Sequence, residues 1–171
     1  GAPTIAGTGV AFGPYRYDQE DVARELTKVN GPEFMRFAQT SGVSHRNLAI
    51  PLHRYPTMSG FTEANDAYVE VATELGAQAL LSSLEAADLR PDEVDAIVMV
   101  SSTGVAVPTI DARVATKVGL RPDVKRIPLF GLGCVAGAAG MARVHDYLRG
   151  FPGHVAALVS VELCSLTLQH D

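Results

Sequence analysis

The chain has 171 residues, of which 47% are hydrophobic and 19% are charged, and its net charge is -5. This composition predicts one globular domain with a packed core, residues 1–171, and excludes a disordered chain. The 14 basic residues are scattered, and no apolar run is long enough to span a bilayer. We therefore expect no nucleic-acid and no membrane partner, and a small molecule as the substrate.

The two cysteines and the N-terminus indicate the compartment. Cys134 and Cys164 stand in no metal-binding spacing, and the chain lacks the cysteine density of a disulfide scaffold. The opening residues, GAPTIAGTGVAF, lack the basic and apolar regions of a signal peptide. These features predict a cytoplasmic protein whose thiols stay reduced.

In the first half of the chain, predicted strands, helices and loops alternate. We expect a strand over residues 4–12, then a helix that Asp18 caps and that continues to Val29. Residues 45–52 look like a short extended segment, and residues 56–66 are loop-like in composition. A long helix with an apolar stripe is expected over about 62–87.

The second half continues this alternation. Residues 94–100, VDAIVMV, form an apolar run typical of a strand covered on both faces. Thr109 is expected to cap a helix through about Val118, and residues 125–130 to form another strand. Cys134 is expected to open a helix of small residues, before a closing strand over residues 154–161. Together these elements predict a layered α/β domain with a mostly parallel sheet.

Two chemistries compete for the stretch FGLGCVAGAAG around Cys134. As a G-x-G-x-x-A pattern, Gly131, Gly133 and Ala136 would form a dinucleotide loop, with Glu162 on a ribose hydroxyl. As a nucleophile, a cysteine at a helix start is favoured as thiolate by the helix dipole and by unpaired N–H groups. The late position of the glycine pattern argues against a dinucleotide. Local sequence does not distinguish a nucleophile from an inert core cysteine.

A longer pattern decides between these interpretations. The segment SSTGVAVPTIDARVATKVGLRPDVKRIPLFGLGCVAGAAG, followed by VSVELCSL, resembles the N-terminal half of type III polyketide synthases, the chalcone synthase superfamily. The GLGCVAGAAG variant is most similar to the actinobacterial branch. The resemblance implies a thiolase-like fold in a homodimer, and an acyltransferase that extends acyl-CoA starters with malonyl-CoA. It implies no metal and no nicotinamide, and it favours alkylpyrone-type products.

The resemblance also assigns roles to single residues. By position, Cys134 matches the cysteine that accepts the starter acyl group and holds the growing polyketide. Arg36 matches a basic residue that holds the CoA phosphates, although Glu33 and Thr40 replace neighbouring family lysines. Val107 matches a loop residue that reaches into the cavity of the partner subunit. The family's cavity-lining positions match Ser102 and Thr103, before the TGV turn, and Cys164 and Thr167 on the later strand.

No other polar residue of the chain is assigned a catalytic role. Glu162 is expected near Cys134 as a hydrogen-bonded group rather than a proton carrier. The family's catalytic histidine and asparagine belong to a C-terminal half, so we expect residues 1–171 to perform acyl loading at most. Two alternatives are an initiating β-ketoacyl synthase of fatty-acid synthesis and a non-catalytic acyl-binding or dimerising fragment. No catalytic role is assigned to the five histidines, His45, His53, His145, His154 and His170.

Overall fold

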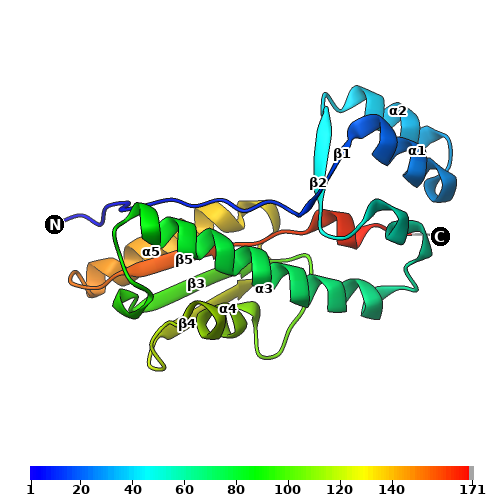
Figure 1. The fold of residues 1–171 in the computed structure, drawn as a ribbon. Helices are drawn as coiled ribbons and strands as arrows, with labels where there is room; N and C mark the ends of the chain where they lie inside the picture. The colour runs from blue at the N-terminus through cyan, green and yellow to red at the C-terminus, as the bar shows by residue number, and fades with distance from the viewer. Residues whose placement is uncertain (170–171) are drawn as a thin grey trace. The chain divides into compact units, whose positions relative to one another are not determined.

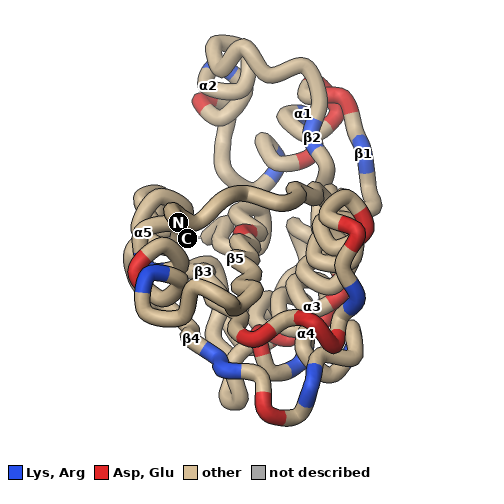
Figure 2. Tube along the Cα trace, turned by 90° about the vertical axis from the view of Figure 1, so that its left-hand side faces the viewer, with Lys and Arg blue, Asp and Glu red and all other residues tan. Residues whose placement is uncertain are grey.

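The computed structural model of the chain describes residues 1–169, which form two compact units (Figure 1). The first unit contains residues 1–11 and 72–162, and the second contains residues 12–71 and those from 163 onward. The long helix α3 (Phe61–Ala86) passes from the second unit into the first. In Figure 2, Lys and Arg lie interspersed with Asp and Glu along the trace.

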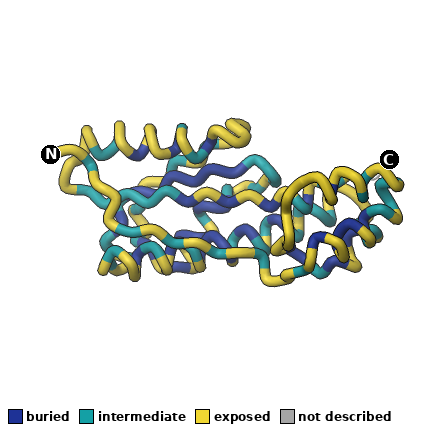
Figure 3. Tube along the Cα trace, turned by 90° about the horizontal axis from the view of Figure 1, so that it is seen from above, coloured by how far each residue is buried: buried dark blue, intermediate teal, exposed yellow. Residues whose placement is uncertain are grey.

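A three-stranded parallel sheet forms the core of the first unit. Its order is β4 (Lys125–Phe130), β3 (Ala96–Ser101) and β5 (Ala156–Ser160). All residues of β3 are buried, and this strand runs through the dark-blue centre of the unit in Figure 3. The apolar run of residues 94–100 predicted such a strand, because a strand covered on both faces has no polar side.

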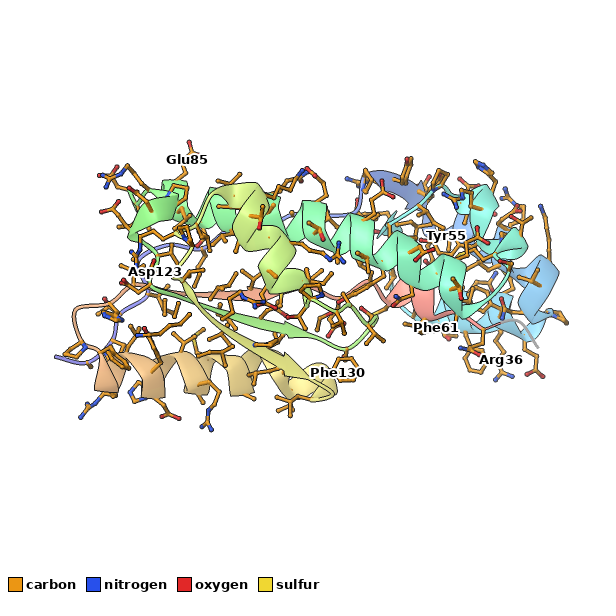
Figure 4. The ribbon with its side chains drawn as sticks, turned by 90° about the horizontal axis from the view of Figure 1, so that it is seen from below. Arg36, Tyr55, Phe61, Glu85, Asp123 and Phe130 are labelled. Atoms are coloured by element: carbon orange, nitrogen blue, oxygen red, sulfur yellow. The ribbon has the colours of Figure 1, made fainter. Side chains whose placement is uncertain are left out.

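Helices cover both faces of this sheet (Figure 4). α5 (Ala136–Gly150) packs on β3 and β5, whereas α4 (Ile110–Val118) packs on β3 and β4 from the other side. Gly140 of α5 lies so close to the sheet that a Cβ would stand 2.7 Å from Cδ1 of Leu158 and 3.1 Å from Cγ1 of Val100. The small residues of α5 therefore allow this helix to approach the sheet closely, as the layered α/β prediction requires.

The predicted strand over residues 4–12 is wrong. Residues 1–11 run as an extended segment beside α3 instead, where Oγ of Ser83 donates a hydrogen bond to the carbonyl of Gly7 at 3.2 Å (Figure 1). A Cβ on Gly9 would lie 2.3 Å from the carbonyl oxygen of Ala79. Local sequence shows that a segment is extended, but a strand also needs a partner, and none of the described strands pairs with this segment.

The second unit contains a small antiparallel sheet and, besides the start of α3, two α-helices. β1 (Tyr15–Asp18) pairs with β2 (His45–Leu48), and α1 (Gln19–Asn30) and α2 (Glu33–Thr40) pack on each other. The predicted helix after Asp18 and the extended segment at the start of residues 45–52 are thus confirmed, although the Asp18 side chain makes no capping hydrogen bond. α2 was not predicted, because eight residues show little helical periodicity, and β1 was not predicted either.

Candidate active site

Cys134 lies in the turn between β4 and α5. Gly131 and Gly133 have φ angles of 84° and 58°, in the left-handed region that favours glycine. This conformation forms a 3-10 turn over Gly133–Val135, so α5 begins at Ala136 and not at the cysteine as predicted. The Cys134 thiol is free and exposed, and the 3-10 turn that holds it leads directly into α5. This position suits a thiol that must meet a substrate.

Ser102 and Glu162 form a hydrogen-bonded pair at the same edge of the sheet. The amide of Ser102 donates to both carboxylate oxygens of Glu162 at 3.0 and 3.2 Å, and its hydroxyl donates at 2.9 Å. Ser102 follows β3 and Glu162 follows β5, while the turn with Cys134 follows β4. The carboxyl ends of parallel strands meet at one edge, so all three residues belong to that edge. Glu162 is hydrogen-bonded, as the sequence predicted.

Large apolar side chains around Cys134 are exposed. Their exposed fractions range from 42% for Leu132 to 66% for Phe130, and Val135 and Met141 lie between these values. Figure 4 shows Phe130 at the carboxyl end of β4. Exposed apolar groups gathered in one segment are characteristic of a binding surface. The thiol is therefore placed among groups that favour an apolar partner or ligand.

The loop between β3 and α4 carries three of the predicted site residues. Ser102 is its first residue, Thr103 follows and is partly buried, and Val107 is 91% exposed. The loop ends at Thr109, which occupies the N-cap position of α4, although its side chain makes no capping hydrogen bond. These residues and Cys134 thus all belong to the first unit.

Arg36 belongs to the second unit, on α2 (Figure 4). Its side chain is exposed and forms no ion pair with any described residue, whereas Arg24 and Lys28 of α1 both pair with carboxylates. Glu33 lies one helical turn before Arg36, and the hydroxyl of Thr40 donates to the Arg36 carbonyl at 3.1 Å. An unpaired guanidinium is suited to phosphate, but the carboxylate of Glu33 opposes an anion there.

Cys164 and Thr167 are exposed residues of the second unit. They begin and end a short 3-10 helix, so the predicted strand placement is wrong. The last backbone hydrogen bond between this segment and the sheet runs from the N–H of Val161 to the carbonyl of Val100, at 3.1 Å. Past this point the chain leaves the sheet and enters the 3-10 helix, in which the hydroxyl of Thr167 donates a hydrogen bond to the Cys164 carbonyl at 2.7 Å.

Tyr55 is a residue of this region that the sequence did not identify. Its buried hydroxyl lies 2.7 Å from Oγ of Ser165, inside the 3-10 helix, and accepts the N–H of Ile50 at 3.4 Å. Burial raises the pKa of Tyr55, so its hydroxyl stays protonated. Tyr55 therefore holds the helix that carries Cys164 and Thr167. No local signal reveals a contact between residues so distant in sequence.

Metal sites, membrane-spanning helices and histidine contacts are the other features of interest in residues 1–169. No group of three or more His, Cys, Asp or Glu side chains there is arranged to hold a metal ion. None of the described helices has the length and apolar character needed to cross a membrane. Nδ1 of His154 lies 2.6 Å from the hydroxyl of Tyr147, and His145 lies 3.7 Å from Asp146. His170 is outside the described residues.

Comparisons with known proteins place this chain in a family. The profile described as "Chalcone and stilbene synthases, N-terminal domain" matches residues 26–170. A 1,3,6,8-tetrahydroxynaphthalene synthase of Streptomyces peucetius subsp. caesius is 45% identical over 98% of this chain and 46% of that protein. A phloroglucinol synthase of Pseudomonas fluorescens is 29% identical over 98% of this chain and 50% of that protein.

Solved structures of related proteins share the fold of this chain. The 1,3,6,8-tetrahydroxynaphthalene synthase of Streptomyces coelicolor A3(2), a bacterial type III polyketide synthase, superposes with a TM-score of 0.88 at 26% identity, over 98% of this chain and 49% of that one. PKS-I of the brown alga Ectocarpus siliculosus gives 0.86 at 25% identity, over 96% and 49%. The predicted thiolase-like α/β fold is confirmed. The chain spans about half the length of these relatives.

Proposed function

The chain belongs to the chalcone and stilbene synthase family, and we propose on this basis that it is the part of a type III polyketide synthase that carries the acyl-accepting nucleophile, Cys134. The observation that supports this role is the free, exposed thiol at the β4–α5 turn, inside the matched residues and beside apolar side chains. A dinucleotide loop in this turn is disfavoured, because Ser102 already occupies the carboxylate of Glu162.

The proposed first step is acyl transfer. The sulfur of Cys134 attacks the carbonyl carbon of an acyl-CoA thioester, the bond to the CoA sulfur breaks, and the thiol proton passes to the departing CoA thiolate. The products are acyl-Cys134 and free CoA. Sulfur suits this step because it is nucleophilic and the resulting thioester stays exchangeable.

The proposed second step is decarboxylative condensation with malonyl-CoA. The bond between the malonyl methylene and its carboxylate breaks and releases CO2, and its electron pair forms the new bond to the acyl carbon. Cys134 leaves and takes up one proton, so its thiol is restored. We propose that a histidine and an asparagine from a C-terminal half assist this step, and that neither a metal nor a nicotinamide takes part.

Other residues have supporting roles in this proposal. Arg36 holds the CoA phosphates, and Val107 reaches into the cavity of a second copy in a homodimer. A cytoplasmic setting fits the two free thiols. We propose that small or short side chains line the substrate cavity: Ser102, Thr103, Cys164 and Thr167.

Two product classes follow from different observations. The small side chains of Ser102 and Cys164 favour a long acyl chain and an alkylpyrone product. The relative that is 45% identical is named for 1,3,6,8-tetrahydroxynaphthalene, which makes a polyhydroxylated naphthalene the second candidate. An initiating β-ketoacyl synthase is less well supported, because the two relatives named above are polyketide synthases rather than enzymes of fatty-acid synthesis.

Intact-mass measurement after mixing the chain with acyl-CoAs of several lengths tests the nucleophile. We expect a mass increase of one acyl group in the wild type and none in Cys134→Ala, with Cys164→Ala as the matched control that retains it. Acylation that persists in Cys134→Ala contradicts the assignment. If the folded chain takes up no acyl group from any acyl-CoA, a non-catalytic acyl-binding or dimerising role is favoured.

A second incubation, with malonyl-CoA added, tests the need for a C-terminal half. We expect loading without CO2 release from residues 1–171 alone, and release of CO2 together with a pyrone or a naphthalene when the second half is supplied. Turnover by the verified 171-residue chain would contradict this expectation, and would require a catalytic role for one of its own histidines.

A further inference from the structure

The loop that carries Val107 is held at both ends by a carboxylate. At its start, Glu162 accepts the amide and hydroxyl hydrogen bonds of Ser102. Just past its end, Asp111 in the first turn of α4 accepts a hydrogen bond from Nη1 of Arg126 on β4 at 2.9 Å. The two anchors therefore fix the loop to β5 on one side and to β4 on the other.

The pair of Asp111 and Arg126 is costly in itself. The Asp111 side chain is 0% exposed, and its Oδ1 has no hydrogen-bond partner among the described residues. Arg126 is 42% exposed, so water weakens its attraction to the carboxylate. Apolar residues in the place of a buried ion pair are often at least as stabilising. Stability alone is therefore a weak reason for this pair.

The ion pair between Asp111 and Arg126 fixes the orientation of α4, which the apolar packing of this helix does not. The buried side chains of Ile110 and Val114 hold the helix against the sheet, but apolar contacts have no preferred orientation. A hydrogen bond from a guanidinium to a carboxylate fixes distance and angle together. It therefore sets the position of the first turn of α4, which begins directly after the loop.

We propose that Asp111 and Arg126 are a positioning pair that, together with Ser102 and Glu162, holds the loop of residues 103–109 in one conformation and thereby sets where Val107 stands. Val107 is 91% exposed and so has little packing of its own within the first unit. The effect of this positioning pair on the reaction rests on the proposed function, in which Val107 reaches into the cavity of a second copy.

Hydrogen exchange of the loop amides tests this pair in the chain as it exists. Asp111→Asn combined with Arg126→Gln removes both charges, so that no unpaired charge stays buried. We expect the amides of residues 103–107 and 109 to exchange at least about tenfold faster, the effect of losing one charge-assisted hydrogen bond. Amides of β5 and α3 are expected to keep their protection. Unchanged exchange of the loop in the folded double variant overturns the proposal.

The matched control is Arg143→Gln with Asp146→Asn, which removes an exposed ion pair of similar length, 2.9 Å, on α5. It is expected to leave the loop amides as they are in the wild type, and acceleration there would show that the effect is not specific to Asp111.

If the first double variant does not fold, Asp111→Leu with Arg126→Met replaces the pair by apolar groups and carries the same expectation. Arg126→Lys keeps the charge and is expected to restore part of the protection.

A functional measurement separates this inference from the proposed function. In the enzyme completed by its C-terminal half, the double variant is expected to load Cys134 normally but to give a broader distribution of product chain lengths. Faster loop exchange with an unchanged distribution supports the positioning pair and contradicts the cavity role of Val107. Failure of the wild type to acylate Cys134 counts against the proposed function, whereas the exchange result stands independently.

Discussion

Arg121 donates a hydrogen bond from Nη2 to Oδ1 of Asp95 at 3.0 Å, at the amino-terminal edge of the parallel sheet. The other oxygen of Asp95 accepts the backbone N–H of Val155 at 2.8 Å. The hydrogen bond from Val155, and then that from Arg121, hold the pKa of the Asp95 carboxyl below its ordinary value. One carboxylate thus joins the starts of β3 and β5 to the turn before β4.

This relationship predicts an acid-sensitive contribution to stability. Because the folded-state pKa of Asp95 is lowered, its contribution is fully present above the unfolded-state value of about 4 and is lost as the pH falls through the lower folded-state value. Asp95→Asn is expected to lower the free energy of unfolding by roughly 1–3 kcal/mol at pH 7. The difference from the wild type is expected to shrink below about pH 4.

Urea denaturation at several pH values between 7 and 3 measures this difference. Asp146→Asn, which removes a negative charge from an exposed ion pair with Arg143 on α5, controls for the change in net charge. A difference between the wild type and Asp95→Asn that stays constant down to pH 3 contradicts the assignment to the Asp95 carboxylate.

Cys134 is expected to react with iodoacetamide several-fold faster than Cys164 at neutral pH. Both thiols are exposed, so accessibility alone does not separate them. The difference arises because the turn that holds Cys134 leads into the 15-residue helix α5, whereas Cys164 lies in an isolated 3-10 helix of four residues. Peptide mapping at short reaction times gives the two rates. Equal rates, or a faster Cys164, would remove the electrostatic argument for Cys134 as the nucleophile.

Arg36→Ala is expected to weaken the binding of CoA esters by about tenfold, the size of one charge-assisted hydrogen bond to a phosphate. Calorimetric titration with CoA measures the dissociation constant, and circular dichroism checks the fold. Arg24→Ala is the matched control, because this exposed arginine of α1 in the same unit is already paired with Glu20 and Asp21. A dissociation constant unchanged by Arg36→Ala would place the CoA phosphates elsewhere.

Two glycines of α5 are expected to respond to alanine in opposite directions. A Cβ on Gly137 meets no atom within 4 Å, so Gly137→Ala should raise stability by about 0.5–1 kcal/mol through backbone entropy. A Cβ on Gly140 would stand 2.7 Å from Leu158, so Gly140→Ala should lower stability by roughly 1–3 kcal/mol. Denaturant unfolding of both variants decides this, and a stabilising Gly140→Ala would mean that α5 packs less tightly on the sheet.

Much of the first unit was predictable from sequence. The bounds of β4 and the buried character of β3 agree with the predictions, and the position of Cys134 between a strand and a helix follows from the glycines around it. These features are local, since apolar runs, helical spacing and glycine turns leave their pattern in neighbouring residues. The predicted start of α5 at Cys134 differs by only one short turn, which the left-handed Gly133 produces.

The sequence by itself therefore determined the α/β layers and, through its resemblance to a family, predicted a nucleophile at Cys134. Only the tertiary structure decided which polar groups hold the site. Ser102 and Glu162 are 60 residues apart, and Tyr55 and Ser165 are 110 apart, so no local pattern links them. The same reason explains the error at residues 4–12. Hydrogen bonds and strand pairing depend on partners that the chain brings together only when it folds.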